Sequence, residues 1–188
     1  MSAVIGVVVA LVVLALLWLV VSYNRFVRQR TLVEESWGGI DVELTRRHEL
    51  IPNLVETVRG YATHERELLA SLVQAREDAT AHRTDRPQQR APYEDGISRA
   101  LDGVLARVEA YPDLKASANF LSLQRELTLT EDRIAASRRF YNGNVRAYNT
   151  RISTFPSNLV ASAFDFERRD FFELRDPSVA AAPQVGPL

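Results

Sequence analysis

An uninterrupted apolar segment stands at the start of the chain. Residues 3–23 contain no charged side chain, and Val, Leu, Ile and Ala make up most of them. At about 1.5 Å per helical residue, this segment spans about 31 Å, which matches the roughly 30 Å hydrocarbon core of a bilayer. A helix that is apolar on every face suits a membrane better than the core of a soluble protein. The pattern therefore predicts a transmembrane helix.

The residues on either side of this segment predict whether it is cleaved and how it is oriented in the membrane. A cleaved signal peptide is the main alternative, but no charged side chain precedes the segment and no Ala-x-Ala-like site follows it. We therefore expect an uncleaved anchor, with Trp18 and Tyr23 at the bilayer interface. Arg25, Arg28 and Arg30 follow the segment. Positive charge favours the cytoplasmic side, so the N-terminus is predicted to lie outside and the following domain in the cytoplasm.

Apolar residues recur at helical spacing after the anchor. The series Val33, Trp37, Ile40 and Leu44 has steps of four, three and four, which defines one face of a helix. We expect this helix to continue from the anchor without a break. Pro52 lacks a backbone donor and disfavours helix at the preceding residue. It predicts a turn or sharp kink, with Pro52 in the first turn of a second helix that fades near residue 83.

Further helices are predicted beyond residue 83. Residues 83–93 are polar and contain two prolines, which is typical of a loop. A short third helix then follows and ends near residue 111. The fourth helix carries a sustained heptad of buried-type residues: Phe120, Leu127, Ile134, Tyr141, Tyr148 and Phe155. The fold class is therefore all-α, an N-terminal transmembrane helix continuing into an antiparallel four-helix bundle.

This pattern divides the chain into three parts. We predict a transmembrane anchor over residues 1–23, a helical-bundle domain over 24–175 and a flexible tail over 176–188. The segment 164–172 is aromatic and charged. Its Phe171 and Phe172 are candidates for insertion at the membrane interface, and packing against the bundle is the alternative.

The companion positions in the middle of the heptad are polar and predict a polar seam inside the bundle. Its candidate members are Arg46, Glu65, Gln124, Glu131 and Arg138. A buried hydrogen-bonded network of this kind fixes helix register more than it adds stability. A recognition site for a polar ligand or partner helix is the alternative. Tyr141 and Tyr148 are expected to be core tyrosines with their hydroxyls bonded across the bundle.

Composition removes several classes of function. The 23 basic and 24 acidic residues give a net charge of −1, which lacks the basic excess of a nucleic-acid binder. Cysteine is absent, so disulfides and thiolate sites are excluded. The three histidines do not form a zinc-protease motif, and Glu-x-x-His pairs for a di-iron bundle are missing. We predict no metal site, no cofactor and no catalytic residue.

A set of motifs runs through the chain from residue 23 to about 172. It consists of RRHELIPNLVETV (46–58), YPDLKA (111–116) and TEDRIA (130–135), with shorter stretches at 23–24, 40–42, 60–62, 119–120, 123–124, 141–142, 148–149 and 155–156. In these motifs the sequence resembles a known family of bacterial membrane proteins, the LemA family. The resemblance implies a single transmembrane helix, an outside N-terminus and a helical bundle, and it carries over no catalytic residue. Asp132 departs from the family's usual Asn, and Gly38-Gly39 from more helix-favouring residues.

Together these features predict a membrane-anchored, non-enzymatic interaction or scaffold protein at the membrane surface. Its expected partners are the lipid bilayer and either a protein partner or further copies of itself, with no nucleic acid. Two alternatives stay open. One is a ligand sensor or enzyme that uses the polar seam, and the other is a membrane-shaping protein.

Overall fold

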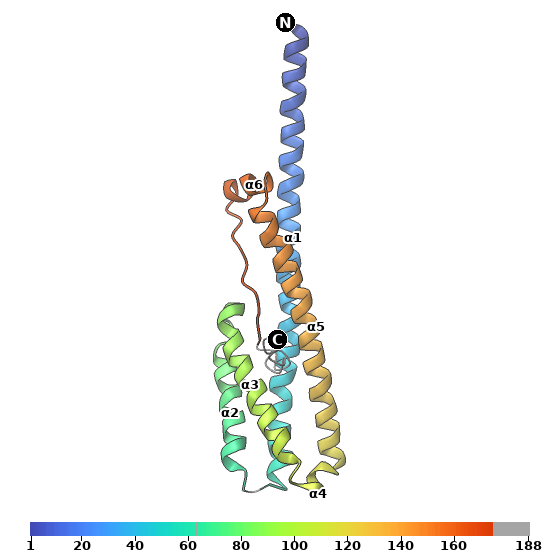
Figure 1. The fold of residues 1–188 in the computed structure, drawn as a ribbon, viewed down its shortest axis with the longest axis vertical. Helices are drawn as coiled ribbons and strands as arrows, with labels where there is room; N and C mark the ends of the chain where they lie inside the picture. Colours follow the sequence, from blue (N-terminus) through green and yellow to red (C-terminus); the bar gives the residue numbers. More distant parts are fainter. Residues whose placement is uncertain (63, 175–188) are drawn as a thin grey trace, which may run out of the picture. The chain divides into compact units, whose positions relative to one another are not determined.

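The computed structural model describes residues 1–62 and 64–174, and every regular element among them is an α-helix (Figure 1). The helices are α1 (Ser2–Arg59), α2 (Arg66–Ala81), α3 (Pro87–Val108), α4 (Pro112–Lys115), α5 (Ala118–Ser153) and α6 (Ser157–Ala163). Two compact units form, one from residues 1–42 with 135–171 and one from residues 43–134 with residues 172–174. The helices α1 and α5 contribute to both. The predicted tail at 176–188 lies outside the described residues.

The apolar N-terminal segment forms the first part of α1, as predicted, and the helix continues from it without a break to Arg59. Residues 1–21 are all exposed, so none of the residues that the structure describes buries their apolar side chains. Among the described residues, α1 is the one helix long and apolar enough to cross a membrane. A bilayer supplies the apolar surroundings that the protein itself does not.

The predicted break at Pro52 is wrong, because α1 runs through this residue. Proline removes the backbone bond that residue 52 would donate to the carbonyl of His48. The Nε of Arg76, on α2, donates to that carbonyl at 2.8 Å instead. Pro52 itself is exposed, so its ring meets no neighbouring helix. A side chain from the next helix thus replaces the missing backbone donor, and α1 ends only at Arg59.

The predicted loop over 83–93 is too long, because α3 begins at Pro87. Proline favours the first helical position, where its N–H would have no helical partner, and Arg86 before it is extended. Pro92 also lies inside α3. Because Pro92 and Gln88 are both exposed, water can reach the carbonyl that Pro92 leaves without its helical donor.

The unit of residues 43–134 is the predicted antiparallel four-helix bundle. It consists of the end of α1, then α2, α3 and the first half of α5, joined by short connections that reverse the chain each time. Its core is built from aliphatic side chains of all four helices, with Phe120 and Leu127 from the predicted heptad. The core members are Ile51, Leu54, Val55, Val58, Ala62, Leu69, Leu72, Ala79, Ile97, Leu101, Val104, Val108, Leu114, Phe120 and Leu127.

The other unit pairs residues 2–42 of α1 with the second half of α5. The rings of Phe26 and Tyr148 meet at 6.2 Å between centroids, and those of Trp37 and Tyr141 at 5.4 Å. The partner numbers fall on α5 as they rise on α1, so the two helices are antiparallel here. The last member of the predicted heptad, Phe155, lies outside the helix, because α5 ends at Ser153; Phe155 is 75 % exposed. Pro156 disfavours helix at the residue before it.

Gly38 and Gly39 do not mark a close approach of helices. Both are exposed, and a Cβ added at either one would meet nothing within 4 Å. Glycine inside a helix lowers the helix propensity or lets a neighbouring helix approach closely, and the structure leaves only the first effect for this pair.

Candidate functional site

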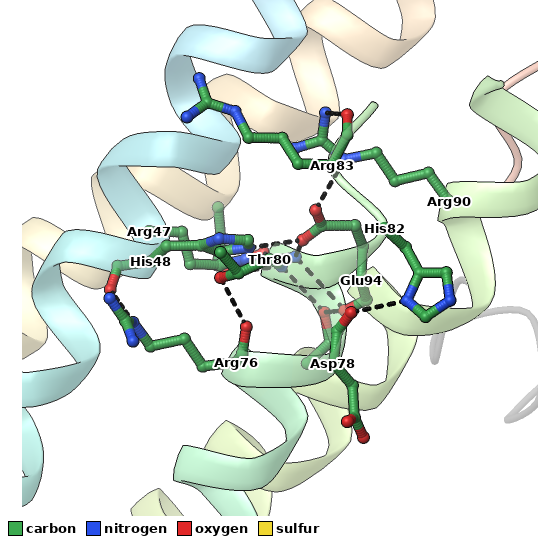
Figure 2. A network of polar contacts seen from close by, with 11 residues as sticks. Arg47, His48, Arg76, Asp78, Thr80, His82, Arg83, Arg90 and Glu94 are labelled. Carbon is green, nitrogen blue, oxygen red and sulfur yellow. Dashed lines mark hydrogen bonds and ion pairs between the residues drawn. The ribbon is translucent and has the colours of Figure 1, made fainter. Parts of the chain in front are cut away.

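A buried cluster of charged side chains joins three helices of the bundle (Figure 2). We call it the Arg47 cluster. Its members are Arg47 and His48 on α1, Arg90 and Glu94 on α3 and Glu131 on α5. Arg90 and Glu94 are four residues apart and therefore lie on the same face of α3. The side chains of Arg47 and Glu94 are 0 % exposed, and that of Arg90 is 1 % exposed.

Glu94 is at the centre of the cluster. Its Oε2 accepts hydrogen bonds from Nη2 of Arg47 at 2.6 Å and from Nε2 of His48 at 3.1 Å. Its Oε1 accepts from Nε of Arg90 at 3.0 Å. A carboxylate only accepts hydrogen bonds, so His48 presents Nε2 as the donor. Each carboxylate oxygen of Glu94 is therefore engaged by a neighbouring side chain.

These contacts decide the protonation state of Glu94. Burial by itself raises the pKa of a carboxyl group, because the charged form loses its hydration. The hydrogen bond from His48 and the charge and hydrogen bond of Arg47 outweigh burial and lower the pKa of Glu94 to about 2. Glu94 is consequently a carboxylate at neutral pH and is a poor proton donor or acceptor there.

Arg47 links α1 to the two other helices of the cluster, α3 and α5. Besides Glu94, its Nη1 donates to Oε1 of Glu131 at 3.1 Å and to Oγ of Ser98 at 3.0 Å. Two arginines thus face two carboxylates, and the cluster carries no net charge while His48 is neutral. Glu131 is the one of these charged groups with substantial exposure, its side chain being 43 % exposed.

The arrangement is suited to holding helices in one register. Shifting α1 along its axis would leave Arg47 and Glu94 as unpaired buried charges, which is costly. The described residues contain no group of three or more His, Asp or Glu side chains placed to hold a metal ion. His48 is hydrogen-bonded to Glu94, and His64 is exposed.

Of the predicted seam in this unit, only Glu131 belongs to the cluster. Arg46 is exposed and pairs instead with Glu126 at 2.8 Å. Gln124 is exposed as well. Glu65 lies just before α2, where it accepts from Nε of Arg107 at 2.7 Å and from the hydroxyl of Tyr111 at 2.8 Å. These two hydrogen bonds, that of Arg107 first, lower the pKa of Glu65.

The other predicted seam residues belong to the unit of residues 1–42 and 135–171. Arg138 is half-buried on α5. Tyr141 and Tyr148 are buried, as expected of core tyrosines. The hydroxyl of Tyr141 donates to the carbonyl of Asp170 at 2.8 Å, so its partner is the extended chain after α6 and not another helix. Burial raises the pKa of Tyr141 to about 12.

Asn149 fastens the same extended chain to α5. Its Nδ2 donates to the carbonyl of Arg169 at 2.8 Å, and its Oδ1 accepts from the backbone N–H of Arg169 at 2.9 Å. Asn149 therefore satisfies both backbone groups of one residue, which is the pairing that a neighbouring strand would otherwise supply.

The candidates for the membrane interface fall into two groups. At the end of the apolar segment, Trp18 is 42 % and Tyr23 is 38 % exposed, and the arginines at 25, 28 and 30 are exposed. Phe171 is half-buried, and Phe172 is fully buried. The burial of Phe172 favours packing within the protein over insertion of this ring into lipid.

Sequence reasoning missed Arg47, Arg90 and Glu94, although a signal for them was present. Extending the apolar series of α3 backward from Ile97 by alternating steps of three and four reaches Glu94 and then Arg90. The same extension of the α1 series forward from Leu44 reaches Arg47 and then Ile51. The loop assigned at 83–93 excluded Arg90 from the third helix, and the α1 series was ended at Leu44, one step before Arg47.

Comparison with known proteins agrees with this architecture. The LemA family profile matches residues 36–186. The chain belongs to the LemA family. It is 29 % identical over 152 residues to Protein LemA of Metamycoplasma hominis, which covers 80 % of this chain and 68 % of that protein.

Two magnetosome proteins are also similar to this LemA-family chain. Magnetosome protein MamQ 2 of Paramagnetospirillum magneticum is 24 % identical over 179 residues, covering 82 % of this chain and 66 % of the relative. Magnetosome protein MamQ of Magnetospirillum gryphiswaldense is 23 % identical over 178 residues, covering 82 % and 65 %. The chain spans about two thirds of the length of these relatives. With its apolar N-terminal helix, the LemA-family chain is a membrane protein.

Proposed function

We propose that this LemA-family chain is a non-enzymatic interaction or scaffold protein at the membrane surface. In this proposal the N-terminus lies outside the cell and the bundle in the cytoplasm. Three exposed arginines directly after the apolar segment support this orientation. The partner that the bundle holds is another protein or a second copy of the chain.

The observation that carries the proposal is the closed state of the Arg47 cluster. Its central carboxylate is fully buried, and both of its oxygens are bonded to side chains of the same bundle. A group of this kind stabilises one arrangement of helices and presents no charge to a substrate. The polar residues that would serve a reaction thus serve the architecture.

The test uses photo-crosslinking in living cells with the full chain. A photoreactive amino acid replaces Leu129, an exposed apolar residue on α5. Discrete adducts, either with a defined protein or between two copies, are the expected result. Glu131→Gln removes the half-exposed carboxylate of the cluster, and Glu126→Gln removes a carboxylate of a surface ion pair as the matched control.

A scaffold keeps the same adducts in both variants, because each change replaces one carboxylate by an amide of nearly the same shape and leaves the apolar surface of α5 in place. If Glu131→Gln changes the adducts while Glu126→Gln does not, the cluster reports on a ligand and the sensor or enzyme alternative replaces the scaffold. If residue 129 and other exposed positions of the bundle form no adducts at all, that absence would contradict the proposal of an interaction protein.

A membrane-shaping protein is the second candidate. The observation that favours it is the similarity to MamQ, whose name assigns it to magnetosomes. Electron microscopy of liposomes that carry the full chain separates the two candidates. Liposomes whose outlines match those of protein-free liposomes agree with a scaffold, and liposomes drawn into tubes or buds support shaping.

A further inference from the structure

A short helix lies beside the end of the transmembrane segment. In Figure 1, α6 lies next to α1 in the unit that contains the N-terminus. The ring of Phe164, the residue after α6, meets the ring of Tyr23 at 5.0 Å between centroids. Phe166 contacts Tyr23 at 5.7 Å and stacks on Phe26 at 4.8 Å. Tyr23 lies two residues before Arg25, the first charged residue after the apolar segment, so these contacts hold α6 near the end of that segment.

One side of α6 is packed within the protein. Val160 and Ala161 are each 3 % exposed. Ser22 is 5 % exposed although residues 1–21 of α1 are all exposed. The backbone N–H of Phe166 donates to the carbonyl of Ala161 at 2.9 Å and so closes the turn after the helix.

Large apolar side chains on α6 and close to its two ends are exposed. Phe155 is 75 %, Leu159 is 59 % and Phe164 is 45 % exposed. No Asp, Glu, Lys or Arg occurs anywhere from residue 152 to residue 164. An exposed apolar patch without charges is unusual on a surface that faces water and typical of one that contacts protein or lipid.

A basic side chain precedes this uncharged stretch, and an acidic one, Asp165, follows it. The basic residue is Arg151, and its guanidinium lies 5.8 Å from the ring centre of Phe26. Burial and the nearby positive charge of Arg25 both lower the pKa of Arg151. Two like charges held together at the foot of an apolar surface are stabilised by an anion, and the phosphate groups of lipids supply one at this depth.

We propose that α6, with Phe155 and Phe164 at its two ends, is a second membrane element that lies in the interface of the bilayer. Phe155, Leu159 and Phe164 contact acyl chains, while Arg25 and Arg151 face lipid phosphates. The occupant of this surface is lipid because the surface continues the transmembrane surface of α1 at its end. The inference rests on membrane anchoring alone and is independent of the scaffold function.

The chain has no cysteine, so single-cysteine variants report depth directly. The full-length variants Phe155→Cys and Leu159→Cys are labelled with bimane and placed in liposomes that contain brominated phosphatidylcholine. Leu11→Cys, in the middle of the apolar segment, is the control for a lipid-exposed site. Arg146→Cys, an exposed position on α5, is the control for a site in water.

We expect bromolipid to quench the labels at 155 and 159 at least about twofold more strongly than the label at 146. Quenching equal to that at position 146 would overturn the proposal. Nitroxide labels at the same positions detect the competing occupant. Spin–spin broadening at 159 that disappears on dilution with unlabelled protein would show that a second copy covers α6, which also overturns it.

Discussion

Glu94 shows how much depends on one buried charge. Replacing it by Gln leaves Arg47 and Arg90 without their buried counter-charge. Removing one partner of a buried pair costs about 3–5 kcal/mol, so we expect Glu94→Gln to lower the free energy of unfolding by this amount. Urea unfolding of the full chain in detergent micelles, followed by circular dichroism, measures the change.

The control for Glu94→Gln is Glu126→Gln, which removes the exposed partner of Arg46. Exposed pairs contribute about 1 kcal/mol or less, so this variant should unfold close to the parent. Equal losses in the two variants would contradict the central role given to the buried carboxylate.

Glu94 also determines the direction in which stability changes with pH. The pKa of Glu94 is lowered from its ordinary 4.5 to about 2 in the folded chain. The unfolded chain therefore binds the proton more readily, and folding is weakened as pH falls. The contribution, about 3 kcal/mol for this shift, is complete above pH 4.5 and disappears as pH falls toward 2.

Urea unfolding between pH 2 and pH 6 checks this dependence. Glu94→Gln should flatten the part of the profile that lies below pH 4.5, since the variant cannot titrate at this position. A profile of the same steepness in the variant would assign the acid sensitivity to other carboxylates.

At the scale of elements, α1 depends on a donor from α2 to pass Pro52. Arg76→Leu removes the donor to the carbonyl of His48. An acceptor left without a partner in a partly buried place costs about 1–3 kcal/mol. Pro52→Ala restores a backbone N–H at the position that bonds this carbonyl in an ordinary helix.

A double-mutant cycle measures the exchange between the two donors. We expect Arg76→Leu to be clearly less destabilising in the Pro52→Ala background than in the parent. Strictly additive changes would show that Arg76 does not take over the role of the missing backbone donor.

The glycine pair in α1 makes a prediction about helix propensity. Because neither Cβ would meet a neighbour within 4 Å, Gly38→Ala and Gly39→Ala should each stabilise the protein by up to about 1 kcal/mol. Thermal unfolding of the full chain measures this, and Ala136→Gly, at an exposed position within α5, should produce a loss of similar size. Destabilisation by either alanine would reveal a contact that needs glycine.

At the scale of the whole molecule, the orientation in the membrane is open to a direct measurement. A membrane-impermeant maleimide should label Ser2→Cys in intact cells and leave Gln124→Cys unlabelled until the cells are opened. The physical reason is the retention of Arg25, Arg28 and Arg30 on the cytoplasmic side. Labelling of Gln124→Cys but not Ser2→Cys in intact cells would reverse the proposed topology.

Much of the fold was predictable because it rests on periodicity. The helical steps of α1 and the heptad of α5 gave the helices and most of their buried faces, including Phe120, Leu127 and Tyr148. Local rules failed at the prolines. Pro52 and Pro92 each disfavour a helix by local rules, but in this chain Arg76 donates to the carbonyl that Pro52 frees, and the residues around the carbonyl that Pro92 frees are exposed.

The Arg47 cluster was harder to predict from the sequence, because charged residues are usually expected at the surface. Arg46 and Arg47 are neighbours of the same type, and only the register of the continuous helix places Arg47 inside and Arg46 outside. Glu94 becomes recognisable only when α3 is extended back to Pro87. The predicted seam joined Glu131 to Arg46 and Arg138, whereas the structure pairs Glu131 with Arg47.

By itself, the sequence determined the membrane-spanning helix and the helical class, because both follow from the spacing and number of apolar residues along one segment. Tertiary structure alone decided which charges are buried, which donor reaches the carbonyl of His48 and which rings meet at Tyr23. These contacts join residues far apart in the chain. Their energy depends on desolvation and on distances of a few ångströms, which no local pattern of residues specifies.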